Sequence, residues 1–234
     1  CALPISKPYI DVGLYCRDRE AVTAFWQQEV GLAFESLLKL GGGAQQWRHD
    51  LSGSILKINH QRDGLPNAVA SGYDGIVVAD ETVDEPVTMT DPEGNRVTLV
   101  QPGFEGIDQI AVEMAVADPA LHATFMRRVL GCQEISSRHL KWGETSFYLS
   151  QKRDLEGHAG NVESVLKGPG FRYITVQIWD VDIEHEAAVR GGAVEAMPPT
   201  TLGETARISF IKDPDGNWIE LSQRASLTGP LPSE

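Results

Sequence analysis

The chain has 234 residues, of which 41% are hydrophobic and 23% are charged, and its formal net charge at pH 7 is −13. This length is sufficient to bury one large hydrophobic core or two ordinary ones. The acidic excess disfavours nucleic acids and anionic membranes as partners, because contacts with phosphate need clustered lysine and arginine.

The lengths of the apolar runs and the pattern of the cysteines indicate the cellular compartment to expect. No apolar run approaches the ~18 residues that span a bilayer, and no leader pattern of charged, apolar and small residues opens the sequence. Cys1, Cys16 and Cys132 are scattered and form no Cys-x-x-Cys pair, which argues against a disulfide scaffold or a thiolate zinc site. We therefore expect a soluble protein of the reducing cytoplasm.

The first predicted elements are a strand and a helix. Residues 9–17 alternate between apolar and polar side chains, which predicts a half-buried strand. Asp18 then caps a helix with an apolar stripe, and Gly31 ends it. The same construction returns in the second half of the chain, where residues 109–116 alternate and Asp118 opens a helix. The chain therefore contains an internal duplication.

A short hairpin is also present twice. Its two copies read Asp-Pro-Glu-Gly-Asn from Asp91 and Asp-Pro-Asp-Gly-Asn from Asp213. Proline fixes φ early in the turn, and glycine supplies the positive φ. The strand that leaves the second copy places Ile219 and Leu221 on one face and Glu220 on the other. If the apolar face is core, Glu220 points into the space that the sheet encloses, where a carboxylate needs a metal, a cation or a proton.

The two copies predict two domains. The second copy reads as two units of a strand, a helix and three strands, whereas residues 80–85 of the first copy leave no room for a second helix. The linker at 101–106 contains proline and glycine and marks a boundary. We expect an N-terminal domain at 7–101 that serves as scaffold, a C-terminal domain at 106–224 that holds the active cavity, and a tail at 225–234.

With the ending Asp-Pro-Asp-Gly-Asn-Trp-Ile-Glu-Leu at 213–221, the chain resembles the vicinal oxygen chelate superfamily, which includes glyoxalase I, extradiol dioxygenases and bleomycin-resistance proteins. The resemblance implies an α+β fold of tandem βαβββ units that form two glyoxalase-like domains with open, barrel-like mixed sheets. In metal-dependent members the glutamate of this ending is a metal ligand, and the matching residue here is Glu220. The first copy has Thr98 at that position.

The resemblance places the remaining metal ligands on the first and last strands of each unit, and this chain departs from them. The second domain has Ala111, Tyr148 and Tyr173 at these positions, and the first domain has Asp11, Lys57, Gly75 and Thr98. No divalent ion favours the first-domain set, in which Asp11 and Lys57 are expected to pair with each other. An oxygen site of Glu220 with Gln109 and Glu113 stays open as an alternative. A divalent metal is thus the less favoured expectation, and no other cofactor is indicated.

The candidate active cavity lies around Glu220. Tyr173 and Tyr148 are its candidate catalytic partners, although aromatic residues also line small-molecule pockets without reacting. The candidate ligand-binding residues are Gln109, Glu113, Trp218, Trp142 and His139. In the structural alternative, Glu220 is a buried carboxylate paired with Arg172, Arg207 or a tyrosine hydroxyl. The remaining histidines show no ligand spacing and are expected at the surface.

Two classes of function remain open. The first is an enzyme that acts on a small organic molecule by isomerase, lyase or dioxygenase-like chemistry, with Glu220 as a metal ligand or as a metal-free general base. The alternative is a non-catalytic protein of the bleomycin-resistance type, which sequesters a cationic molecule between aromatic walls. We favour the enzyme. The expected partner is a small molecule, with neither nucleic acid nor membrane, and the chain is expected to be a monomer or a homodimer.

Overall fold

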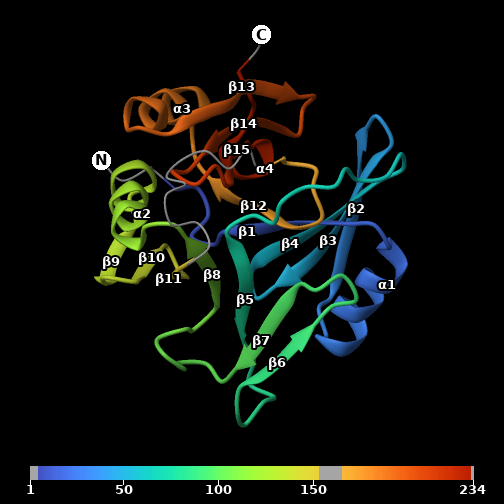
Figure 1. Ribbon diagram of the computed structural model, residues 1–234. Coiled ribbons are helices and arrows are strands. Elements are labelled where there is room, and N and C mark those ends of the chain that lie inside the picture. The colour runs from blue at the N-terminus through green and yellow to red at the C-terminus, as the bar shows by residue number, and fades with distance from the viewer. Residues whose placement is uncertain (1–4, 153–164, 233–234) are drawn as a thin grey trace. The chain divides into compact units, whose positions relative to one another are not determined.

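The computed structural model describes residues 5–152 and 165–232 as a mixed α and β structure with two mixed sheets (Figure 1). The eight-stranded sheet has the order β13 (Val194–Leu202), β14 (Ala206–Lys212), β15 (Trp218–Arg224), β12 (Gly170–Gln177), β1 (Asp11–Cys16), β4 (Ser54–Gln61), β3 (Ala44–Leu51) and β2 (Phe34–Gly41). The seven-stranded sheet has the order β6 (Val87–Thr90), β7 (Arg96–Val100), β5 (Tyr73–Ala79), β8 (Ile110–Val116), β11 (Thr145–Gln151), β10 (His139–Trp142) and β9 (Gln133–Ser136). The expected α+β fold class is confirmed.

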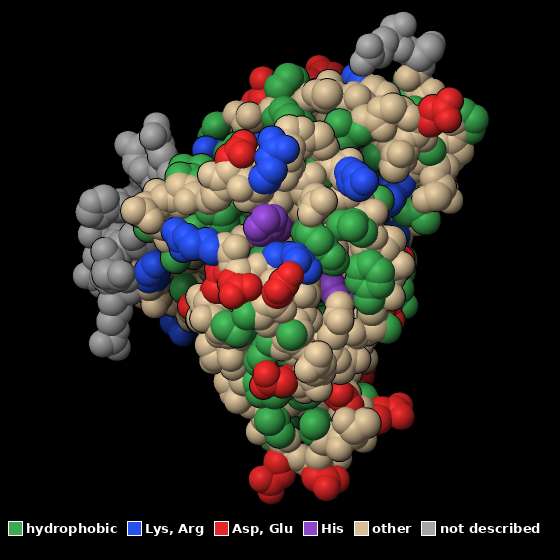
Figure 2. All heavy atoms as spheres, turned by 90° about the vertical axis from the view of Figure 1, so that its right-hand side faces the viewer, with side chains coloured by type: hydrophobic (Ala, Val, Ile, Leu, Met, Phe, Trp, Pro, Cys, Tyr) green, Lys and Arg blue, Asp and Glu red, His purple; other side chains and the backbone are tan. Residues whose placement is uncertain are grey.

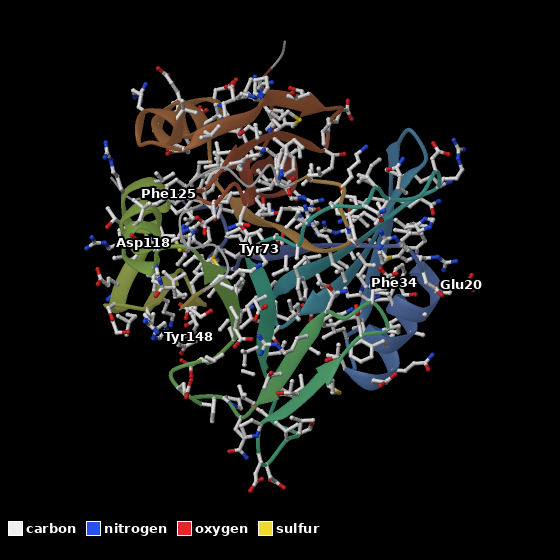
Figure 3. The ribbon with its side chains drawn as sticks, viewed as in Figure 1. Glu20, Phe34, Tyr73, Asp118, Phe125 and Tyr148 are labelled. Carbon is white, nitrogen blue, oxygen red and sulfur yellow. The ribbon has the colours of Figure 1, made fainter. Side chains whose placement is uncertain are left out.

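The helices are α1 (Arg19–Ala24), which continues as the π-helical turn η1 (Phe25–Glu29), α2 (Pro119–Phe125), which continues as η2 (Met126–Leu130), α3 (Val181–Arg190) and α4 (Ala225–Thr228). The first two of the four α-helices begin where the sequence places their caps, and α4 lies in the segment expected to be a tail. Asp18 accepts a hydrogen bond from the Ala21 N–H at 3.0 Å, and Asp118 (labelled in Figure 3) accepts two at the start of α2. These bonds satisfy N–H groups that have no partner within the helix.

Both Asp-Pro hairpins form, and their internal bonds match. Asp91 Oδ1 accepts from the backbone N–H groups of Glu93 and Asn95, each at 2.9 Å. In the second copy Asp213 Oδ1 accepts from the N–H groups two and four residues later, also at 2.9 Å. In each copy the asparagine amide donates back to Oδ2 of the aspartate at 2.8 Å. The predicted turn and its duplication are therefore present.

Spatial contacts divide the chain into two compact units that differ from the two halves of the sequence. Within the described residues, one unit comprises 5–10, 115–152 and 174–232, and the other comprises 11–114 and 165–173. The sheets explain this, because each contains strands from both halves: β12 neighbours β1, and β5 pairs antiparallel with β8. The division into tandem domains at 7–101 and 106–224 stays a prediction.

In the unit that contains 11–114, β1 is buried along its whole length, although the sequence predicts a half-buried strand. One face carries the apolar residues Val12 and Leu14. Over the other face lies the ring of Tyr173, so close to β1 that a Cβ at Gly13 would overlap it. A strand inside a sheet that is covered on both faces has no solvent side.

In the other unit, α3 packs against the hairpin of β14 and β15 and against β13. Ile219 and Leu221 are 2% and 0% exposed, as the alternation of β15 predicts. Glu220, between them in sequence, must therefore point to the opposite face of the sheet.

Among the described residues, no helix combines the length and apolar character that crossing a membrane requires. On the face drawn in Figure 2, acidic side chains lie among basic and apolar ones. This mixture differs from the basic stripe that binds nucleic acid.

Candidate functional site

Glu220 is held by a short hydrogen bond. Its side chain lies on β15 and the residue is 8% exposed, while Thr175 on the neighbouring strand β12 is fully buried. The Thr175 hydroxyl donates to Glu220 Oε2 at 2.5 Å. This distance is at the short end of the range for a hydroxyl that donates to a carboxylate. Glu220 is thus a buried, oriented proton acceptor.

The two arginines that the structural alternative names as partners of Glu220 form bonds to other groups as well, and that alternative stays a prediction. The Arg172 guanidinium donates to the backbone carbonyls of Val165 and Val69. Arg207 forms a two-point ion pair with Asp182, at 2.7 and 2.8 Å. The sequence analysis missed Thr175 as a partner, although Thr175 leaves β12 on the same face as Tyr173, two residues away.

The Tyr173 hydroxyl lies against two side-chain amides. Its hydroxyl oxygen lies 3.4 Å from Gln46 Nε2 and 3.2 Å from Asn59 Nδ2, and the residue is 4% exposed. Gln46 and Asn59 are direct partners in the pairing of β3 with β4, so both amides reach the hydroxyl from one face. Asn59 shares its two hydrogens with the carbonyls of Leu14 and Lys57. Tyr173 is therefore held by contacts within the unit that comprises 11–114 and 165–173.

Lys57 lies beside this tyrosine, and Arg48 lies across the strand pair from Lys57. Lys57 Nζ is 5.5 Å from the Tyr173 ring centroid and 4.0 Å from Asp11 Oδ2, so the expected pairing of Asp11 with Lys57 is confirmed. Arg48 is the direct cross-strand partner of Lys57 and is 6% exposed. Its guanidinium contacts Glu35 at 3.1 Å, and the Glu35 side chain is 49% exposed.

Tyr148, His139 and Trp142 belong to the seven-stranded sheet. Tyr148 on β11 (labelled in Figure 3) stacks on His139, with ring centroids 4.4 Å apart. His139 Nε2 lies 3.0 Å from the Ser146 hydroxyl. Trp142 is 3% exposed and donates to the Leu130 carbonyl at 3.0 Å, which is a packing role.

Gln109 and Glu113 are also associated with the seven-stranded sheet. The Gln109 amide donates to Ser52 O at 2.9 Å and to Ser54 Oγ at 2.8 Å, and so holds the turn between β3 and β4. Glu113 pairs with Arg96 at 3.1 Å. Burial raises the pKa of the Glu113 carboxyl, and the Arg96 charge opposes that rise.

The donors do not fit the metal site that the family resemblance implies. β15, which carries Glu220, lies in one sheet, and β8, which carries Glu113 and follows Gln109, lies in the other. Within 5–152 and 165–232, no group of three or more His, Cys, Asp or Glu side chains could hold a metal ion. The ammonium of Lys57 stands at a position that the resemblance assigns to a ligand, and an ammonium repels a divalent cation.

Trp218, another candidate ligand-binding residue, has a lysine ammonium against its ring. Lys212 Nζ lies 4.7 Å from the Trp218 ring centroid, and Phe210 meets the same ring edge to face at 5.6 Å. Lysine thus lies over the face of both Trp218 and Tyr173.

The expectation that the remaining histidines lie at the surface is wrong for three of them, which are buried. His122, His185 and His49 are 1%, 5% and 0% exposed. His122 and His185 lie on helix faces turned towards the sheet, where they bond to Asp213 at 2.7 Å and to Glu195 at 2.8 Å. The search for ligand spacing could not detect single histidines paired with distant carboxylates.

The two described cysteines are poor nucleophiles. Burial raises the pKa of the Cys16 thiol and of the Cys132 thiol to about 12 in each case. The thiolate, which is the reactive form, is therefore scarce at neutral pH.

The fold is similar to that of solved two-domain structures. A glyoxalase I from Zea mays superposes with a TM-score of 0.69 at 13% identity, covering 92% of each chain, and a variant of glyoxalase I from the same plant reaches 0.73 at 14% identity, covering 95% of this chain and 94% of that one. A candidate dioxygenase from Bacillus subtilis gives 0.63 at 10% identity, covering 95% of this chain and 86% of that one. At these identities the likeness concerns the fold.

Comparison of the sequence with known proteins also finds glyoxalase-like matches. Residues 106–221 match the family model described as Glyoxalase/Bleomycin resistance protein/Dioxygenase superfamily. A candidate lactoylglutathione lyase from Brassica oleracea var. gemmifera is 38% identical over 65 residues. That segment covers 27% of this chain and spans 23% of the relative's length.

Proposed function

Because residues 106–221 match the family model described as Glyoxalase/Bleomycin resistance protein/Dioxygenase superfamily, we propose that the protein is an enzyme that acts on a small organic molecule by isomerase or lyase chemistry. The observation that carries the proposal is the short bond that orients the buried Glu220 carboxylate. The candidate lactoylglutathione lyase and the glyoxalase I structures support the same class of reaction.

In this proposal Glu220 is the general base. It removes a proton from a substrate carbon next to a carbonyl and returns the proton to a neighbouring atom, so no redox partner is needed. The donor set does not fit a metal, and no step is assigned to one.

The test is turnover by a conservative variant of Glu220. Glu220→Gln keeps the shape of the side chain and removes the base, so we expect a loss in kcat of roughly 100-fold or more. Lactoylglutathione lyase activity is the first assay, followed by exchange of substrate C–H for deuterium across small carbonyl compounds.

Controls separate the catalytic from the structural role. Glu134→Gln, an exposed change on β9, should leave turnover unchanged. A Glu220→Gln protein that is destabilised but turns over normally would make Glu220 a structural residue. If the wild type shows no turnover in any assay, the protein is a binder rather than an enzyme.

The cationic-drug binder is the weaker alternative. A binder of that type needs bare aromatic faces for its ligand. Here Lys57 and Lys212 lie over Tyr173 and Trp218 and so repel a second cation.

A further inference from the structure

We propose that Lys212 recognises a carboxylate of the substrate, so that the molecule acted on at Glu220 is a carbonyl compound that also carries a carboxylate group. The inference rests on the proposed function and adds the class of substrate. Both residues belong to one compact unit and to neighbouring strands, Lys212 to β14 and Glu220 to β15 (Figure 1).

The pairing of β14 with β15 puts Lys212 and Glu220 on one face of the sheet. Lys212 is directly opposite Trp218, and Phe210 is directly opposite Glu220. Trp218 and Glu220 are two residues apart on β15, so their side chains leave the strand on the same face. Lys212 is therefore a diagonal neighbour of Glu220, and residues in that relation are roughly 7–8 Å apart. One small molecule can contact both side chains across that separation.

The Lys212 ammonium has hydrogen-bond donors that no protein group takes up. Its contact is with the face of the Trp218 ring, whose centroid lies 4.7 Å from Nζ. Within residues 5–152 and 165–232, Lys212 forms no ion pair with a carboxylate. An ammonium carries three N–H donors, and contact with a single ring leaves those that point away from it. A carboxylate is the partner that gains most from such donors.

The charge of Glu220 gives a reason for a cation at this position. Glu220 is a buried carboxylate, and the whole chain has a formal net charge of −13. A substrate that brings its own carboxylate is repelled by both, unless a positive charge lies close to it. Lys212 supplies that positive charge on the face of the sheet where Glu220 lies.

The other two members of this four-residue group are aromatic. Phe210 and Trp218 meet edge to face, with ring centroids 5.6 Å apart, and they flank the line from Lys212 to Glu220. Phe210 and Glu220 are 7% and 8% exposed, whereas Trp218 and Lys212 are half-buried. The carbon chain of the substrate would lie on apolar rings, while its carboxylate would stay at the wetter end, where less hydration is lost.

The probe is 4-oxopentanoate, which has C–H bonds next to a carbonyl and a carboxylate a few bonds away. Its methyl ester is the uncharged counterpart. Binding of each compound is measured by NMR titration at neutral pH and low ionic strength. The wild type should bind the acid about tenfold more tightly than the ester, because an ammonium–carboxylate contact is stronger than a neutral one but is weakened by water at a half-buried site.

Variants of Lys212 separate its charge from its packing. Lys212→Met keeps an apolar stem against Trp218 and removes the charge, so it should bind the acid and the ester alike. Lys212→Arg keeps the charge and should keep the preference for the acid. The matched control is Lys39→Met, which removes one charge from the exposed strand β2 and should also keep the preference. Melting temperatures check that each variant folds.

The wild type provides a readout that depends on no variant's folding. Its Trp218 indole N–H signal, assigned with Trp218→Phe, should shift on addition of the acid more than on addition of the ester. A wild type that binds the two compounds equally, or a folded Lys212→Met protein that still prefers the acid, overturns the inference. In the second case the lysine only covers the Trp218 ring.

The two proposals fail separately. A preference for the acid that requires Lys212, in a protein whose turnover is absent or indifferent to Glu220→Gln, would remove the base and keep the carboxylate site. Turnover that requires Glu220, with the acid and the ester bound alike, would do the reverse.

Discussion

The Asp91 and Asp213 hairpins have the same internal bonds but different neighbours. Asp91 Oδ2 accepts from the indole N–H of Trp26 at 3.3 Å, whereas Asp213 Oδ2 bonds to the imidazole of His122 at 2.7 Å. Both neighbours lie on the helix that follows the first strand of a repeated unit. The backbone of the turn requires its aspartate in both copies, but the group that completes the hydrogen bonding has diverged from a neutral donor to an ionisable one.

The strands that leave the hairpins differ in the same way. On β7 the residue that corresponds to Glu220 is Thr98, whose hydroxyl forms a hydrogen bond with the Thr88 hydroxyl at 3.0 Å. On β15 it is Glu220, which accepts the short bond from Thr175. The turn therefore specifies the register of the strand that leaves it. The single residue seven positions after the turn aspartate specifies the chemistry of that strand.

The largest expected effect comes from removing the turn aspartate. Asp213→Ala leaves two backbone N–H groups and the His122 imidazolium without their acceptor, and should cost about 3–5 kcal/mol of unfolding free energy below neutral pH. Asp91→Ala leaves only neutral donors and should cost about 1–3 kcal/mol. Urea unfolding of both variants tests the difference, and equal losses would show that the charge on His122 contributes nothing.

A pH series sharpens the comparison. Burial opposes the charged form of His122, but the charge and hydrogen bond of Asp213, followed by Asp215 and Asp118, raise its pKa above the ordinary 6.5. A raised folded pKa stabilises the protein fully below 6.5, and that stabilisation is lost as pH rises through the folded pKa. Wild-type unfolding free energy should therefore fall between neutral and alkaline pH. His122→Gln should flatten the curve, while Trp26→Phe should leave its slope unchanged.

The smallest effect concerns the first hairpin. Trp26→Phe keeps most of the buried ring and removes the N–H that reaches Asp91, so we expect a loss of ~1 kcal/mol from the hydrogen bond, plus a further loss of packing free energy for the smaller ring. Trp26→Leu, which loses both the N–H and the edge-to-face contact with Phe25 at 5.5 Å, should cost more. Equal melting temperatures for the wild type and Trp26→Phe would remove the proposed role of the indole.

Local chemistry determined which parts of the structure the sequence predicted. The caps at Asp18 and Asp118 and the two Asp-Pro turns depend on residues within a few positions of one another, and all are confirmed. The partner strand of β12, the bond from Thr175 and the burial of His122 depend on segments that are distant in sequence. Alternation identified the polar face on which Glu220 lies, but it could not say which strands that face would meet.

The neighbours of β1 have a consequence for how the chain folds. β1 stands near the start of the sequence, yet one of its two neighbours in the sheet, β12, comes from the last third. During synthesis on the ribosome, one edge of β1 therefore remains unpaired until β12 emerges. Pairing over such a separation is slow, because the intervening loop must close first. An unpaired, largely apolar strand edge is also a site where a second nascent chain can attach, so the nascent protein is most exposed to misassembly before β12 is made.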